Sequence, residues 1–104
     1  MADNEGNEYD LRGRAVIITG AGQGIGRVYA REFGRVGAKV VIADLDAANA
    51  ERVAGEVRQA GGEAIAVRTD VTSPESVQAM ADRTLAAYGR IDVLVNNAGL
   101  YAKK

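Results

Sequence analysis

The sequence predicts an α/β domain built on a doubly wound parallel sheet covered by helices. Two observations lead to this prediction. Four short runs rich in β-branched residues are separated by three segments with helical periodicity, so the elements alternate as β-α-β-α-β-α-β. Strands that alternate with helices form a parallel sheet, and the connections between such strands are right-handed crossovers.

The predicted strands are short and apolar. They span residues 15–19 (AVIIT), 39–43 (KVVIA), 64–67 (AIAV) and 91–95 (IDVLV). Three of the four runs are nearly continuous in apolar residues instead of alternating with polar ones. Continuous runs are typical of strands that are buried on both faces of a parallel sheet.

The three segments between the strands place apolar residues at helical spacing. We expect helices over residues 24–36, 46–60 and 74–88. Ser73 before Pro74 is typical of a helix start, and a glycine follows each segment, where a left-handed residue ends a helix. The predicted apolar faces are Ile25, Val28, Tyr29, Phe33 and Val36 in the first helix; Ala50, Val53, Ala54 and Val57 in the second; and Val77, Met80, Ala81, Leu85 and Tyr88 in the third.

Length and composition exclude several classes of protein. The chain has 104 residues, which indicates one domain, and its formal net charge of -1 favours no nucleic-acid partner. Cysteine and histidine are absent, so disulfides and sites built on thiolate or imidazole ligands are excluded, and we expect no metal. No apolar run resembles a signal peptide or a membrane span, so we expect a cytoplasmic location and no membrane partner.

A glycine-rich segment joins the first predicted strand to the first predicted helix. It reads TGAGQGIG over residues 19–26, a register that differs from the general G-x-G-x-x-G fingerprint. Backbone N–H groups at a helix N-terminus favour anions, and glycines let a diphosphate approach them. A plain flexible turn is the alternative, and the lack of Gly-Lys-Ser/Thr argues against a P-loop. We expect cofactor contacts from Gly20, Gly22, Gln23, Gly24, Ile25 and Gly26.

Within this segment three glycines have separate expected roles. Gly20 permits the tight turn out of the strand, Gly24 lets the backbone close on the phosphates, and Gly26 lets the helix pack against the strand.

A carboxylate ends the second predicted strand. Asp44 is placed to accept hydrogen bonds from the adenosine ribose hydroxyls and to repel a 2′-phosphate, with Leu45 beside it in the cofactor site. Neither Leu45 nor Gln23 is basic, so we expect no cation in position to receive that phosphate. The sequence therefore predicts NAD as the cofactor in preference to NADP. A helix cap is the alternative role for Asp44, although Asp46 is better placed to cap the second helix.

Four motifs in order along the chain carry a family resemblance. They are the glycine-rich segment, Asp44, the pair Asp70-Val71, and the segment Asn-Asn-Ala-Gly at residues 96–99. Together they resemble the short-chain dehydrogenase/reductase family over residues 11–99. The resemblance implies a Rossmann-type sheet, partial in this chain, with the strand order 3-2-1-4. It places the cofactor at the carboxyl ends of strands one and four.

The resemblance also implies roles for residues after the third and fourth strands. Asp70 and Val71 would contact the adenine, while Asn97 and Gly99 would lie along the cofactor. From the residues alone, a short polar side chain and a glycine after a strand also make an ordinary turn.

Catalysis in this family uses a Tyr-x-x-x-Lys pair with a serine upstream. No tyrosine of this chain has a lysine four residues later, so we expect no catalytic residue here. We interpret residues 1–10 as a flexible N-terminal segment and residues 11–104 as an NAD(P)-binding domain that is truncated after strand four. The isolated chain is accordingly expected to be inactive.

The resemblance implies that the full-length protein is an NAD-dependent oxidoreductase. It would interconvert an alcohol and a ketone or aldehyde by hydride transfer, and it would form a homo-oligomer. A non-catalytic nucleotide-binding module is the first alternative. A methyltransferase is the second, against which the glycine spacing and the Asn-Asn-Ala-Gly segment weigh. An uncovered strand at residues 91–95 would further favour self-association or marginal folding of the isolated chain.

Overall fold

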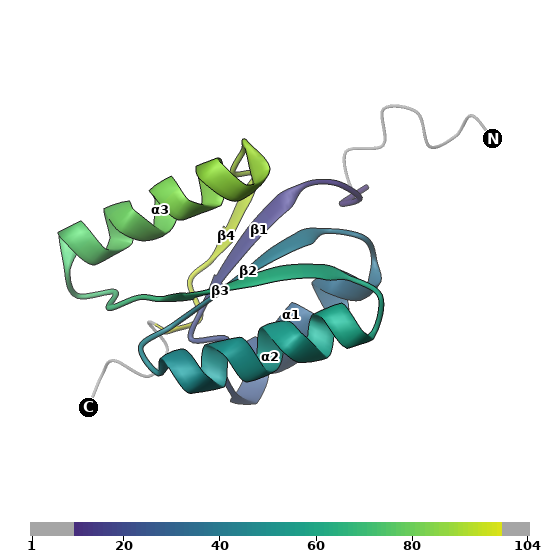
Figure 1. Ribbon diagram of the computed structural model, residues 1–104, viewed down its shortest axis with the longest axis horizontal. Helices are drawn as coiled ribbons and strands as arrows, with labels where there is room; N and C mark the ends of the chain where they lie inside the picture. Colours follow the sequence, from purple (N-terminus) through teal and green to yellow (C-terminus); the bar gives the residue numbers. More distant parts are fainter. Residues whose placement is uncertain (1–9, 99–104) are drawn as a thin grey trace.

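The computed structural model describes residues 10–98, in which strands and helices alternate along the chain. The elements are β1 (Ala15–Thr19), α1 (Gly24–Arg35), β2 (Lys39–Asp44), α2 (Ala47–Gln59), β3 (Glu63–Arg68), α3 (Pro74–Tyr88) and β4 (Val93–Val95). The strands form one parallel sheet with the order β3-β2-β1-β4. Helices α1 and α2 cover one face and α3 covers the other (Figure 1). The predicted doubly wound fold and the implied strand order are confirmed.

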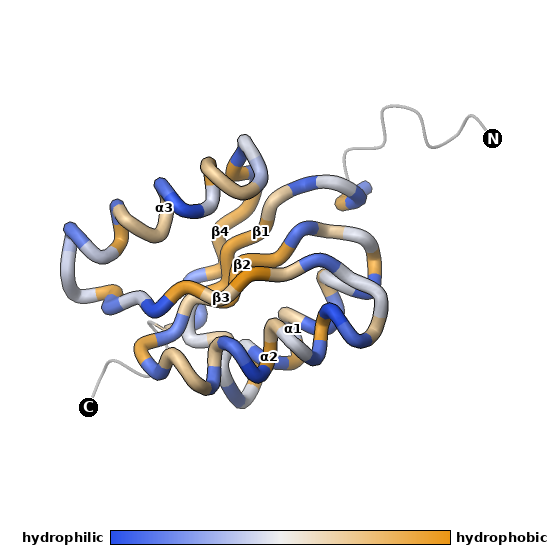
Figure 2. Tube along the Cα trace, viewed as in Figure 1, coloured by the Kyte–Doolittle hydropathy of each residue, from blue (hydrophilic) through white to orange (hydrophobic). Residues whose placement is uncertain are grey.

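Strand β1 lies inside the sheet, between β2 and β4. All five of its residues are buried. Because side chains alternate across a strand, Val16 and Ile18 join the core under α1 and α2, whereas Ile17 joins the core that includes Met80 of α3. Figure 2 shows apolar residues concentrated along the strands, whereas the helices carry both polar and apolar residues. A continuous apolar run thus fills two cores at once.

Helix α1 packs through its small residues instead of its large apolar ones. Its buried positions are Gly26, Ala30 and Gly34. A Cβ atom at Gly34 would lie 2.6 Å from Cγ1 of Val57, so the glycine lets α1 and α2 approach closely. The predicted apolar face is therefore wrong for most of its members. Phe33 packs against the core, but four other residues are exposed: Ile25, Val28, Tyr29 and Val36.

The other two helices follow the predicted faces to different degrees. Helix α2 buries all four predicted residues. Helix α3 buries Met80 and Thr84 and leaves Val77 and Leu85 exposed, so the predicted face is only partly correct. Thr84 is buried without penalty because its hydroxyl donates a hydrogen bond to the Met80 carbonyl at 2.9 Å. A polar residue at that spacing is easily missed in a search for apolar faces.

The helix ends agree with their sequence signals. The Ser73 side chain accepts a hydrogen bond from the Ser76 N–H at 3.2 Å, and Gly89 ends α3 in the left-handed region at φ 75°. The Asp46 side chain caps α2 by accepting from the Asn49 N–H at 3.0 Å. Within residues 10–98, no helix has the length and apolar character that crossing a bilayer requires.

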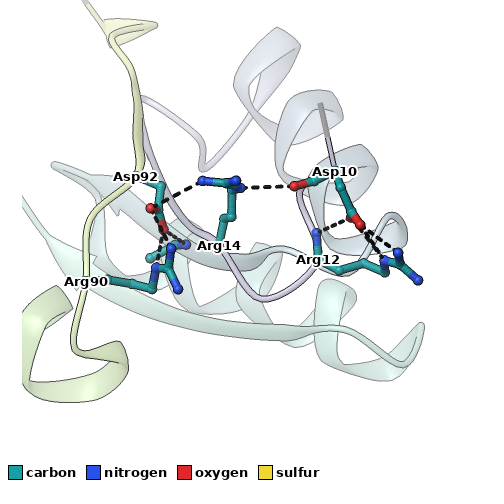
Figure 3. Close-up of polar contacts among 6 residues, drawn as sticks. Asp10, Arg12, Arg14, Arg90 and Asp92 are labelled. Atoms are coloured by element: carbon teal, nitrogen blue, oxygen red, sulfur yellow. Dashed lines mark hydrogen bonds and ion pairs between the residues drawn. The ribbon is translucent and has the colours of Figure 1, made fainter. Parts of the chain in front are cut away.

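A polar cluster joins the amino ends of β1 and β4 (Figure 3). The Asp92 carboxylate accepts a hydrogen bond from the Ala15 N–H at 2.9 Å and pairs with the Arg90 guanidinium at 2.6 Å. The Arg14 guanidinium lies 3.8 Å from the same carboxylate and donates to the Asp10 carbonyl at 3.0 Å. The hydrogen bonds from Arg90 and then from Ala15 hold the pKa of the Asp92 carboxyl below its ordinary value.

This side-chain contact also explains why the fourth strand is shorter than expected. Residues 91–95 were predicted to be extended, but ladder pairing with β1 begins only at Val93. Asp92 is attached to β1 by its carboxylate and by its N–H, which donates to the Ala15 carbonyl at 3.0 Å.

Candidate functional site

A cleft with a volume of about 700 Å³ lies at the carboxyl ends of the strands. Its walls come from the segments that follow β1, β2, β3 and β4. In open α/β sheets this edge is where ligands bind, next to the point at which the strand order reverses. The lining residues are Gly20, Gln23, Gly24, Asp44, Leu45, Thr69, Asp70, Val71, Thr72 and Ala98.

The glycine-rich turn between β1 and α1 needs its glycines for geometric reasons. Gly20 and Gly24 adopt φ values of 67° and 61°, in the left-handed region that other residues avoid. A Cβ atom at Gly26 would lie 2.3 Å from the Gly20 carbonyl oxygen and 2.7 Å from Nδ2 of Asn97. The first turn of α1 is therefore folded tightly against the end of β1.

The N-terminus of α1 is left without a side-chain cap. Its N-cap residue, Gln23, makes no capping hydrogen bond, whereas Asp46 and Ser73 cap the other two helices. The first backbone N–H groups of a helix have no partner within the helix, and they carry the positive end of its dipole. Because Gln23 and Gly24 line the cleft, these donors are placed where an anionic group could bind.

The turn after β4 is fastened to the glycine-rich turn. The Thr19 hydroxyl donates toward Asn96 Oδ1 at 3.2 Å and accepts from the Ala98 N–H at 3.0 Å. Asn97 is 2% exposed, and its Nδ2 donates to the Gly20 carbonyl at 3.2 Å. Its buried Oδ1 finds no partner among residues 10–98. The Asn97 side chain therefore joins the turn after β4 to the end of β1.

The Asp44 carboxylate is held in place by two backbone amides. Its Oδ2 accepts from the Gly22 N–H at 2.8 Å, and its Oδ1 accepts from the Asp46 N–H at 2.8 Å. A Cβ atom at Gly22 would lie 2.8 Å from Oδ2, so only glycine allows this contact. Each carboxylate oxygen retains acceptor capacity, since a carboxylate has about four lone-pair sites. Asp44 can thus accept hydroxyl groups without leaving its position.

Two exposed apolar side chains and one carboxylate line the outer part of the cleft. Leu45 is 57% exposed and Val71 is 39% exposed, and both line the cleft. Between β3 and α3, Asp70 accepts from the Thr72 hydroxyl at 2.6 Å and from its N–H at 2.9 Å. The hydrogen bond from the Thr72 hydroxyl is the largest cause that holds the pKa of the Asp70 carboxyl below its ordinary value, and the bond from the Thr72 N–H adds to it.

The structure brings most of the predicted site residues together. Seven of them line the cleft: Gly20, Gln23, Gly24, Asp44, Leu45, Asp70 and Val71. Gly22 and Asn97 lie in the segments after β1 and β4, Ile25 and Gly26 lie in the first turn of α1, and Gly99 lies outside the described residues. Sequence reasoning missed the lining residues Thr69, Thr72 and Ala98, although each lies next to a predicted site residue.

One basic residue near the glycine-rich turn was missed. The sequence indicated no cation near the ribose position, because Leu45 and Gln23 are not basic. In the structure, Nη2 of Arg52 from α2 donates to the Gly22 carbonyl at 3.1 Å. A cation is therefore placed on the glycine-rich turn by a helix that begins after β2. In the same helix, Nη1 of Arg52 also lies 3.4 Å from Asn49 Oδ1, one helical turn earlier.

Comparison with known proteins agrees with this geometry. A protein-family model described as short chain dehydrogenase matches residues 14–104. The chain is 47% identical over 89 residues to a 7alpha-hydroxysteroid dehydrogenase of Escherichia coli (strain K12), covering 86% of this chain and 35% of that protein. The chain thus spans little more than a third of the length of this curated relative.

Solved structures show the same likeness. A short chain dehydrogenase/reductase from Burkholderia phymatum in complex with NAD has a TM-score of 0.80 and 42% identity, covering 83% of this chain and 31% of the other. A metagenomic short-chain oxidoreductase in complex with NADP has a TM-score of 0.79 and 42% identity, covering 85% of this chain and 40% of the other. With its sheet order, its glycine-rich turn and these matches, the chain belongs to the short chain dehydrogenase family.

Proposed function

We propose that this chain is the cofactor-binding part of an NAD-dependent oxidoreductase that interconverts an alcohol and a ketone or aldehyde. The single observation that carries the proposal is the cleft. It combines an uncapped helix N-terminus, a carboxylate anchored by two amides, and exposed apolar side chains. These three features match the diphosphate, the ribose and the aromatic base of a dinucleotide.

Each part of the cofactor has its own residues in this proposal. The backbone around Gln23 and Gly24 would hold the diphosphate, because the N–H groups there favour anions. Leu45 and Val71 would cover the adenine, with Asp70 at its edge. Ala98 and the predicted residue Gly99, both after β4, would lie toward the nicotinamide, which supplies the hydride acceptor or donor.

The choice of NAD over NADP rests on Asp44. Its oxygens are anchored by the amides of Gly22 and Asp46, so the carboxylate cannot turn away from the ribose without losing both hydrogen bonds. Two unit charges about 4 Å apart repel by roughly 4 kcal/mol at an effective dielectric constant near 20. Solvent and salt reduce this value because the site is open to water. The remaining repulsion still favours a 2′-hydroxyl over a 2′-phosphate.

We further propose that the 104-residue chain binds the cofactor without turning over a substrate. Hydride transfer to a carbonyl needs a proton donor at the substrate oxygen. No tyrosine of the sequence has a lysine four residues later to form the family's catalytic pair. A non-catalytic nucleotide-binding module is therefore the second candidate for the isolated chain.

Calorimetric titration of the purified chain with NAD, NADP and S-adenosylmethionine tests the proposal. We expect NAD to bind most tightly, NADP more weakly, and S-adenosylmethionine not at all. Asp44→Ala removes charge-assisted hydrogen bonds of about 1.5–3 kcal/mol, which corresponds to a loss of roughly ten- to a hundredfold in NAD affinity. Asp82→Ala, which removes the same charge from exposed α3, is the matched control and leaves the affinity unchanged. Binding of S-adenosylmethionine in place of NAD would contradict the proposal.

A further inference from the structure

We draw no further inference here: the strongest candidate, the exposed apolar surface at edge strand β4 that includes Leu94, carries none, because nothing among residues 10–98 shows what covers it.

Discussion

Replacing Gly26 by alanine tests whether the glycine-rich turn is set by close packing. The new Cβ atom would lie 2.3 Å from the Gly20 carbonyl oxygen, 2.7 Å from Asn97 Nδ2 and 2.8 Å from Ala21 Cα. Two of these atoms belong to the backbone, so the strain cannot be relieved by turning a flexible side chain. Overpacking of this kind costs about 1–3 kcal/mol. Displacing the Gly20 carbonyl from Asn97 costs about 0.5–1.5 kcal/mol more.

Alanine also favours the helix over glycine, by about 0.5–1 kcal/mol. The expected net effect of Gly26→Ala is therefore a destabilisation of about 1–3 kcal/mol. For a chain of this size, each kcal/mol lowers the melting temperature by about 4–8 °C. The assay is thermal and urea unfolding followed by circular dichroism, together with NAD titration of the folded variant, in which we expect weaker binding.

Gly55 provides the matched control. It lies in α2, and a Cβ atom there meets only Nη2 of Arg58, at 4.0 Å. The same substitution at Gly55 is expected to stabilise the chain by about 0.5–1 kcal/mol through helix propensity alone. If Gly26→Ala also stabilised the chain, and NAD bound as before, the reasoning about the turn would be refuted.

Three further predictions concern the stability and the self-association of the domain. Because the pKa of Asp92 is lowered in the folded state, its contribution to stability is complete above its ordinary value of 3.8 and is lost as the pH falls below it. The free energy of unfolding of Asp92→Asn in urea should therefore change less with pH in acid than that of the wild type. An identical pH dependence would count against a stabilising role for the polar cluster at the amino ends of β1 and β4. Ser73→Ala removes the cap of α3 and should cost about 1 kcal/mol in urea unfolding; an unchanged midpoint would exclude the cap as a source of stability. Leu94, 57% exposed on edge strand β4, should promote self-association, and Leu94→Lys should shift sedimentation profiles toward monomer; a wild type that sediments as a monomer would contradict this prediction.

The parts of the fold that were predictable from sequence depend on local chemistry. Continuous apolar runs indicated strands buried on both faces, and β1 and β2 are buried on both faces. The caps at Asp46 and Ser73 are likewise local, because each side chain bonds a backbone amide three residues later. Spacing alone was enough for these features.

The faces of α1 could not be predicted in the same way. Periodicity identifies an apolar stripe, but it does not say how closely the helix approaches its neighbours. Here Gly26, Ala30 and Gly34 allow a close approach, so the small residues are buried and the larger Ile25 and Val28 are exposed. The depth of packing is a tertiary property.

Residues of the cleft could be predicted where a single side chain carries the chemistry. They could not be predicted where a contact joins two elements that are distant in the sequence. Asp44 was indicated by its place after a strand, and the structure brings it to the cleft. Arg52 was missed because its partner is a backbone carbonyl 30 residues away in the sequence. No pattern of residue types in the sequence indicates a contact between a side chain and a distant backbone carbonyl.

The most direct test of the central claim is a nuclear magnetic resonance titration of the isotopically labelled chain with NAD. If the cleft holds the dinucleotide, the amide signals that move most belong to the glycine-rich turn, to Asp44 and Leu45, and to residues 70–72. Signals of the amino ends of the strands, around Ala15 and Asp92, remain in place. Shifts confined to other surfaces, or no saturable shifts at all, would contradict the account.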